Sequence, residues 1–445
     1  MIFLVLGLGQ GACYLFLLSL GNLRHHIIAC EYGFFAAFLL YAVTLFLLRT
    51  KRTHPQDELT HYHNHYPLLN RRRVLISILF FSVFFRMVMW LSPPTLSDDV
   101  YRYLWEGRLL SAQINPFEYA PSDPALEYLR DPEVFSQINH KHLSAIYPPL
   151  NLFIFRLSTQ VHPTTSAMNM TFILFDVLTM VVLIFTLHTL RLNLTRVTIY
   201  AWNPLVIMEF AGSGHLDSAG IFFLFLAFYF FINKKKFSAT FSLALSFLSK
   251  FFPLMFLPFM LTRKKVIHLF LFVLVGAVSY LPFLSAGEKI FQSLILYAEQ
   301  WVFNASLYDV FLGISSSHAI ARGISAAFFL LIAIGLFAWY TLKLQQERVE
   351  SIYLIGFISI GSLFLLTPVL HPWYLCWIVP FLVIYPHRAW ILLSGSVFLS
   401  YWVLKGYVET GIWKESVIVK MVEYLPFYGL LLYDAVRRYR THLKA

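Results

Sequence analysis

Long apolar stretches recur along the whole chain and are separated by short polar segments. Many of them approach or exceed the roughly 20 residues that a helix needs to cross a ~30 Å hydrocarbon core. They predict membrane-spanning helices near 1–20, 26–48, 74–91, 166–188, 195–211, 216–232, 266–284, 324–342, 351–369, 373–386, 389–404 and 418–433. A break at Lys250 to Pro253 predicts two half-helices in 237–262. We therefore expect a single integral-membrane domain over 1–445 with about fourteen membrane helices, in a range of roughly 11 to 14.

Short basic clusters stand at the ends of the apolar stretches and predict the topology. Cytoplasmic loops carry an excess of Lys and Arg, so each cluster is assigned to the cytoplasm. Both termini and a loop at 49–73 are then cytoplasmic, and a long loop at 92–165 lies outside. The stretch 147–160 is too short to cross and lies on the outer side, so it predicts a helix that dips into the outer leaflet. Most acidic residues fall outside or in the membrane.

Composition supports a membrane protein and argues against nucleic-acid binding. Of 445 residues, 58% are hydrophobic and only 13% are charged, against about a quarter charged in soluble domains. The net charge of +11 is dispersed in the topological clusters, so no nucleic-acid partner is expected. The three histidines in His61–Tyr66 could form a metal clip, but a solvated linker is favoured because no Cys or acid stands at ligand spacing. No metal site is predicted.

The stretch SDDVYRYLWEGRLL, 97–110, begins the long external loop. Ser97 is a good helix N-cap, and Asp98 and Asp99 would occupy the first turn, where the helix dipole stabilises negative charge. Arg102 is three or four residues from both aspartates and four before Glu106, so these charges share one face. Taken alone, the stretch fits a salt-bridged amphipathic surface helix as well as it fits a catalytic one.

Further polar residues are predicted on the same outer side. Ionisable groups at membrane depth are costly and indicate functional sites. The residues concerned are His215, Asp217, Lys250, Glu299, Asn304, Asp309, His371, Trp373 and Tyr374. Their common side predicts chemistry on the extracytoplasmic face.

A set of motifs, in this order, resembles the GT-C glycosyltransferases, especially bacterial polyprenyl-phosphate-mannose-dependent mannosyltransferases. The motifs are Asp98-Asp99 with Tyr101-Arg102-Tyr103, Asn115-Pro116-Phe117, Tyr147-Pro148-Pro149-Leu150, Trp202-Asn203-Pro204, Gly214-His215-Leu216-Asp217, Lys250 with Pro253 and Pro258, the segment Trp301–Leu307, and His371-Pro372-Trp373-Tyr374. The likeness covers most of 74–386. It implies an all-α polytopic GT-C-like bundle whose large first external loop carries amphipathic and re-entrant helices.

The resemblance also implies an activity. A hexose, expected to be mannose, would pass with inversion from a polyprenyl-phosphate donor to a hydroxyl of a glycan or glycolipid acceptor outside the cell membrane. The acid of the first external loop would be the base, which maps onto Asp98 or Asp99. A glycosidase generally needs a second carboxylate to protonate a poor leaving group, whereas a lipid phosphate leaves as a stabilised anion, so one base suffices. Neighbouring side chains point about 100° apart on a helix, and we predict Asp99 as the base.

The departing phosphate needs positive charge. The candidates are Lys250, Arg102, His371 and Arg322, with Arg108 as a further cation. Lys250 is favoured because it lies within an apolar hairpin, although it could instead snorkel to the interface. Arg102 could instead keep the catalytic aspartate ionised. The resemblance firmly implies no cofactor and leaves the need for a divalent cation open.

The candidate sugar and acceptor ligands are Tyr103, His215, Asp217, Asn304, Trp373 and Tyr374. Asp217 could instead cap the span that starts there, and an aromatic belt at the membrane interface explains Trp373 and Tyr374 equally well. Alternative functions are transfer of glucose or a pentose, a transporter or flippase of a lipid-linked substrate, and a non-catalytic scaffold. Transporters often show two comparable halves, and this sequence shows no internal repeat.

Overall fold

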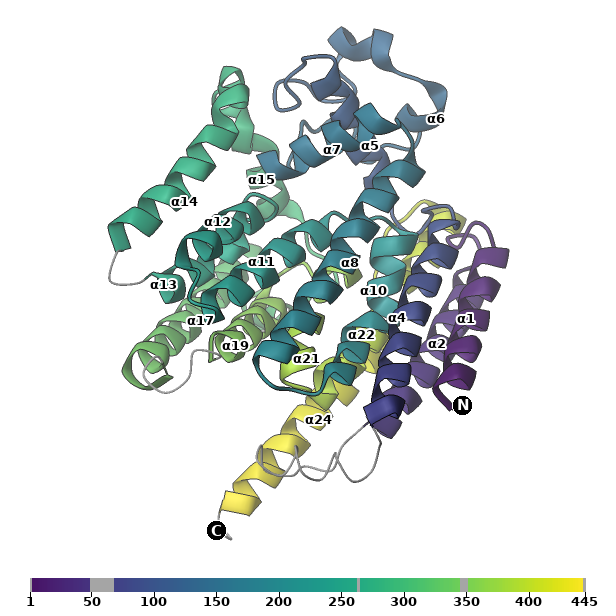
Figure 1. The fold of residues 1–445 in the computed structure, drawn as a ribbon. Coiled ribbons are helices and arrows are strands. Elements are labelled where there is room, and N and C mark those ends of the chain that lie inside the picture. Colours follow the sequence, from purple (N-terminus) through teal and green to yellow (C-terminus); the bar gives the residue numbers. More distant parts are fainter. Residues whose placement is uncertain (1, 49–67, 262–264, 345–350, 443–445) are drawn as a thin grey trace. The chain divides into compact units, whose positions relative to one another are not determined.

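The computed structural model describes residues 2–48, 68–261, 265–344 and 351–442, which form helices and the loops that connect them (Figure 1). No strand occurs in this part of the chain, although one isolated parallel bridge joins Phe303 and Val369. The predicted all-α class is therefore confirmed. The histidines of 61–66 and most of the predicted loop 49–73 lie outside the described residues, and Leu68 already belongs to helix α4 (Leu68–Trp90).

Helices long and apolar enough to cross a membrane are present from end to end. Within the described ranges there are seven: Ile2–Ser19, Ile27–Leu48, Arg72–Trp90, Thr165–Thr189, Val266–Ala286, His318–Lys343 and Arg388–Thr410. Shorter apolar helices accompany them at Asp217–Ile232, Ser351–Leu366 and Pro372–Ile384. The protein is therefore a membrane protein, while the count of about fourteen crossings stays a prediction because several predicted spans are short or interrupted.

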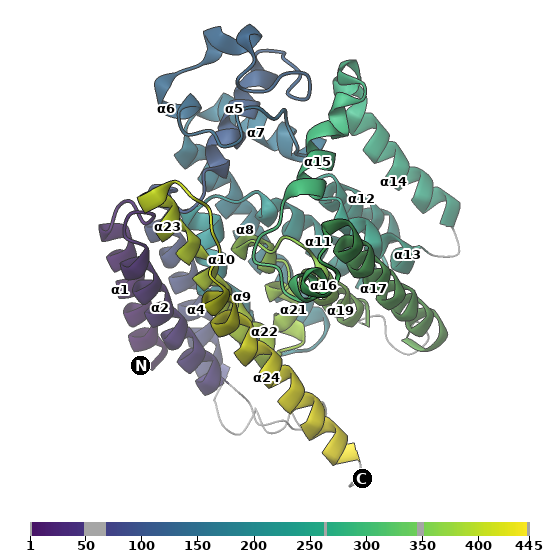
Figure 2. The same cartoon turned by 180° about the vertical axis from the view of Figure 1, so that it is seen from behind.

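The chain divides into two compact units. The first comprises 1–93, 183–212 and 379–445, and the second comprises 94–182 and 213–378. The first unit contains α1 (Ile2–Ser19), α2 (Ile27–Leu48), α4, η2 (Leu194–Val197), α9 (Thr198–Ala201), α10 (Pro204–Ile207), η3 (Met208–Gly212), α21 (Val379–Ile384), α22 (Arg388–Ser396), η7 (Val397–Trp402), α23 (Val403–Thr410) and α24 (Val417–His442). Figure 2 shows α22 beside α24, where Trp390 meets Phe427 edge to face.

The predicted span 195–211 is a series of short helices. The interruption falls at Trp202-Asn203-Pro204, where the Asn203 side chain accepts a hydrogen bond from the Leu205 amide and Pro204 opens the next helix. Proline at the first helical position is pre-organised for a helix start. The preceding helix ends at this point, so its last backbone carbonyls have no amide of the same helix to accept from and need other donors.

Polar side chains from the neighbouring spans supply these donors. Gln10 donates to the Trp202 carbonyl at 2.8 Å, and the Tyr41 hydroxyl donates to the Ile199 carbonyl at 2.8 Å. Arg86 of α4 is fully buried and donates through Nη1 to the Ala201 carbonyl at 2.8 Å and to the Ser82 carbonyl at 2.9 Å. These contacts satisfy backbone groups that lipid could not.

The second unit begins with the long loop and continues into a set of apolar helices. Its elements are α5 (Asp99–Ser111), η1 (Pro124–Leu129), α6 (Pro132–Phe135), α7 (Pro149–Val161), the first part of α8 (Thr165–Thr189), α11 (Asp217–Ile232), α12 (Lys236–Phe247), η4 (Phe252–Phe256), α13 (Leu257–Met260), α14 (Lys265–Tyr280), η5 (Leu281–Ala286), α15 (Lys289–Gln300), α16 (Leu307–Ser315), α17 (His318–Trp339), η6 (Tyr340–Leu344), α19 (Ser351–Leu366) and α20 (Pro372–Leu375). The predicted break at 250–253 is present between α12 and η4.

Helices α5 and α7 pack closely and form the base of the long loop. A Cβ at Gly107 would lie 2.6 Å from the Phe155 carbonyl oxygen and 2.3 Å from Thr159 Oγ1, so only glycine permits this approach. Tyr103 stacks on Phe155 with ring centroids 4.7 Å apart. The α5–α7 pair therefore gives the first residues of α5 a rigid support.

Candidate active site

The two aspartates that open α5 have different surroundings. The helix begins at Asp99 with Asp98 as its N-cap, and the Ser97 hydroxyl accepts from the Asp99 amide at 3.3 Å. The N-cap is thus one residue later than the sequence pattern predicted. As the N-cap residue, Asp98 makes no side-chain capping bond to the helix.

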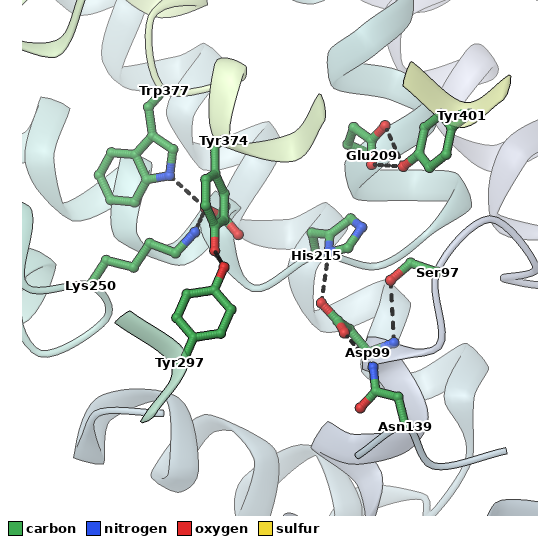
Figure 3. A network of polar contacts seen from close by, with 11 residues as sticks. Ser97, Asp99, Asn139, Glu209, His215, Lys250, Tyr297, Tyr374, Trp377 and Tyr401 are labelled. Carbon is green, nitrogen blue, oxygen red and sulfur yellow. Dashed lines mark hydrogen bonds and ion pairs between the residues drawn. The ribbon is translucent and has the colours of Figure 1, made fainter. Parts of the chain in front are cut away.

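The Asp99 carboxylate is held between two segments distant in sequence. Asn139 Nδ2 donates to its Oδ1 at 2.9 Å, and His215 Nδ1 lies 3.7 Å from its Oδ2 (Figure 3). The Asp99 side chain keeps 22% of its surface exposed. Burial raises the pKa of this carboxyl to about 6, while the hydrogen bond from Asn139 acts in the opposite direction. Asp99 is therefore a carboxylate poised to take up a proton near neutral pH.

Lys250 belongs to a second polar group. Its ammonium pairs with Asp217, and the Trp377 indole donates to the same Asp217 oxygen at 2.6 Å. Lys250 Nζ also lies 3.6 Å from the centroid of the Tyr374 ring, and the Tyr374 hydroxyl is 2.9 Å from the hydroxyl of Tyr297 on α15. Asp217 is 1% exposed and Lys250 is 21% exposed, so the cation keeps access to a ligand while its counter-ion is buried.

A stack of planar side chains joins these two groups. Trp373 lies between two imidazoles, with its ring 3.9 Å from that of His215 and 4.2 Å from that of His371. Phe303 stacks on His371 at 4.7 Å. Burial lowers the pKa of His371 to about 3, and the charge of Lys250 acts in the same direction. The His371 imidazole is therefore neutral and cannot offset a negative charge. A neutral imidazole and the flat ring faces instead suit contacts with a sugar.

The sequence-predicted candidates therefore fall into two sets. One set is connected through direct contacts and comprises Asp99, His215, Asp217, Lys250, His371, Trp373 and Tyr374. The contacts described for the others serve the framework: Tyr103 is 1% exposed within an apolar cluster, and Asn304 donates to the Leu370 carbonyl at 3.5 Å. Arg102 pairs with Glu106, and Arg322 donates to the Trp301 carbonyl at 3.5 Å.

Three residues of the site were not found from the sequence. Asn139, Tyr297 and Trp377 join it through Asp99, Tyr374 and Asp217 respectively. None belongs to a motif that predicted its partner. Among the residues with described positions, no group of three or more His, Cys, Asp or Glu is arranged to hold a metal ion.

Gly214 is required by the turn that places His215 and Asp217. Its φ is +70°, and a Cβ there would lie 1.9 Å from Asn169 Oδ1. We expect Gly214→Ala to reduce the activity of the protein at least about tenfold, because left-handed strain of roughly 1–3 kcal/mol adds to a steric clash. Gly323→Ala is the matched control, because an added Cβ meets nothing within 4 Å. Equal activity and thermal stability of the two variants would contradict this role.

Residues 24–264 match the alpha-(1->6)-mannopyranosyltransferase (MptA_B) family, N-terminal domain. No curated protein and no solved structure matches the chain at a significant level. The family match covers more than half of the 445 residues and includes Asp99, His215, Asp217 and Lys250. The protein is thus a membrane-bound mannosyltransferase that belongs to the alpha-(1->6)-mannopyranosyltransferase family.

Proposed function

We propose that the protein transfers mannose from a polyprenyl-phosphate donor to a hydroxyl of a glycan or glycolipid acceptor, forming an α-(1→6) linkage with inversion on the extracytoplasmic face of the cell membrane. The family name supplies the sugar and the linkage. The observation that carries the mechanism is the chain of contacts from a basic carboxylate, Asp99, to a partly exposed cation, Lys250.

In this mechanism Asp99 accepts the proton of the attacking hydroxyl. The acceptor oxygen forms a bond to C1 of the mannose as the bond from C1 to the phosphate oxygen breaks. The lipid phosphate leaves with that electron pair, and Lys250 stabilises its charge. The ring faces of Trp373 and Tyr374 and the polar groups of His215 and Asp217 would bind the sugars. No proton needs to reach the leaving group, which agrees with a single carboxylate base.

The ion pair between Lys250 and Asp217 allows the Lys250 ammonium to leave Asp217 and bind the donor phosphate. When the donor phosphate binds, the ammonium can turn toward it, since the indole of Trp377 continues to donate to Asp217. The buried carboxylate then keeps a hydrogen bond throughout the cycle. His371, Arg102 and Arg322 remain further candidates for the phosphate, with weaker support. The low pKa of His371 favours a neutral imidazole, Arg102 pairs with Glu106, and Arg322 donates to the Trp301 carbonyl.

The test is an assay of the purified protein in detergent with labelled polyprenyl-phosphate-mannose and a mannan oligosaccharide acceptor. We expect labelled product whose new linkage is cleaved by an enzyme specific for α-(1→6)-mannosides. Donors carrying glucose or a pentose should react far more slowly. Preferred use of one of those donors, or activity with a nucleotide-sugar donor alone, would contradict the proposal.

The pH dependence follows from the environment of Asp99. Because only the ionised carboxylate accepts a proton, kcat/KM should rise tenfold per pH unit below the pKa of Asp99 and level off above it. The burial that raises this pKa to about 6 places the midpoint near pH 6, and not near the ordinary Asp value of about 3.9. A midpoint at or below pH 4 in the initial-rate profile would contradict the assignment.

A further inference from the structure

A short turn of the external loop, 139–143, reaches the active site through one side chain. The His140 carbonyl accepts a hydrogen bond from the Leu143 amide at 2.9 Å, which closes the turn. His140 itself has a φ of +42°, in the left-handed region that is strained for a residue with a side chain. The residue before it, Asn139, points its amide at Asp99 (Figure 3). Because the turn is strained, external contacts must hold it.

Arg102 supplies these contacts. Its Nη1 donates to the His140 carbonyl at 3.3 Å and its Nη2 donates to the Leu143 carbonyl at 2.6 Å, so the guanidinium bridges both ends of the turn. Its Nε donates to Glu106 at 2.7 Å, and the side chains of Arg102 and Glu106 are only 6% and 1% exposed. A planar, buried guanidinium with three bound partners has little freedom to move.

The same helix therefore carries the carboxylate and the anchor of the turn that contacts it. Asp99 and Arg102 are three residues apart on α5. Arg102 binds the His140 carbonyl of the turn, and Asn139, the residue before His140, binds Asp99. Rotation of the Asp99 carboxylate would strain or break its bond to the Asn139 amide, because Arg102 holds the backbone of the turn that carries Asn139. The two carboxylate oxygens thus become inequivalent, with Oδ1 bound to Asn139 and Oδ2 on the side of His215.

We propose that Asn139 is a positioning residue, which fixes the Asp99 carboxylate so that Oδ2 takes the proton of the acceptor hydroxyl, and that the Arg102–Glu106 pair acts through Asn139 by holding the 139–143 turn. This proposal rests on the proposed role of Asp99 as the base. It also assigns Arg102 to the base side of the reaction, three residues along α5 from Asp99, and not to the donor phosphate.

The hydrogen bond from Asn139 also favours the ionised form of Asp99. Burial raises the pKa of Asp99, and the amide of Asn139 opposes that rise. The other charged and titratable groups facing Asp99 come from several segments and remain in place when Asn139 is replaced: Asp98, Tyr103, Tyr147, His215, Asp217, Lys250, Tyr297 and Tyr374. Loss of the Asn139 amide should therefore move the acid limb of the pH profile to higher pH.

The first experiment measures kcat, donor KM and the pH profile of Asn139→Ala and Asn139→Asp in detergent. Loss of this hydrogen bond to a charged group should lower kcat about ten- to a hundredfold. The donor KM should stay within about twofold of the wild-type value. The acid limb should rise by about one pH unit in Asn139→Ala and further in Asn139→Asp, which keeps the shape of asparagine but adds a second carboxylate. Gln137→Ala removes an exposed amide two residues earlier and should leave all three quantities unchanged.

The second experiment replaces the anchor. Arg102→Met combined with Glu106→Leu removes both buried charges together, so that neither is left unpaired. If the pair acts through Asn139, kcat falls and the acid limb shifts as in Asn139→Ala, and donor KM is unchanged. A rise in donor KM at constant pH profile would show that Arg102 binds the phosphate and would overturn its assignment here.

Variants of Asn139 and of Asp99 distinguish a failure of the positioning role from a failure of the base assignment. Thermal unfolding and gel filtration establish first that each variant is folded, and the near-isosteric Asn139→Asp serves if Asn139→Ala is not. An Asn139→Asp enzyme with wild-type kcat and an unmoved acid limb overturns the positioning role even while Asp99→Asn is inactive. Substantial activity of Asp99→Asn would instead overturn the base assignment itself, and the inference with it.

Discussion

Asp99→Asn is expected to reduce mannosyl transfer by about 10²- to 10⁴-fold, which is the usual contribution of a general base. Asparagine preserves the size of the side chain but cannot accept the proton of the attacking hydroxyl. The measurement is the single-turnover rate with labelled polyprenyl-phosphate-mannose at pH 7.5, where Asp99 is ionised in the wild type. Donor binding should persist, because Asp99 does not contact the leaving phosphate in the proposed mechanism.

Asp98→Asn is the matched control for this substitution. The two residues are adjacent, and each variant removes one negative charge from the start of α5. Asp98 is the N-cap residue, whereas the Asp99 carboxylate contacts Asn139 and His215, so we expect Asp98→Asn to have a much smaller effect. The reverse order of the two effects would assign the base to Asp98. Retained transfer in the double variant would exclude both.

Lys250→Met should lower kcat/KM for the donor by about 10²- to 10³-fold, which is typical for loss of one group that stabilises developing charge. The thioether side chain has similar length but cannot stabilise the leaving phosphate. Initial rates over a range of donor concentration measure the effect. Lys414→Met, in an exposed loop of the other unit, controls for loss of a positive charge from the molecule.

The double variant Lys250→Met with Asp217→Asn distinguishes phosphate binding from folding. In Lys250→Met alone, the buried Asp217 carboxylate loses its cation and keeps the hydrogen bond from Trp377, so lower thermal stability is expected. The second substitution removes that unpaired charge and should restore stability. Donor kcat/KM should stay low in the double variant. Recovery of donor kcat/KM together with stability would mean that Lys250 is a structural counter-ion only.

The lengths of the apolar stretches predicted the all-helical class and several of the long helices. The span predicted at 166–188 is α8, Thr165–Thr189, and the predicted break near Lys250 is present. Length and hydropathy could not show that the stretch 195–211 is divided at Asn203. The sequence did carry that signal, because an Asn-Pro pair commonly starts a helix by capping and by a pre-set φ.

The site was predictable where a motif placed polar residues within a few positions of each other. His215 and Asp217 share one turn, and the choice of Asp99 over Asp98 as the base stays a prediction. Spacing could not choose the partner of Arg102, because three acids stand three or four positions away, and the structure pairs it with Glu106. Asn139 was unpredictable for the same reason: it lies 40 residues from Asp99 in the chain.

Buried Arg86 constrains the order of events during biosynthesis. Its guanidinium donates to the Ser82 carbonyl of its own helix and to the carbonyl of Ala201, which follows Arg86 by 115 positions in the chain. A charged arginine within a span is costly in lipid until it finds such a partner. Helix α4 should therefore remain at the insertion machinery, or insert with Arg86 drawn toward one surface, until residues 198–201 arrive. Nascent chains truncated shortly before Ala201 should then hold α4 less stably in the membrane than chains truncated after it.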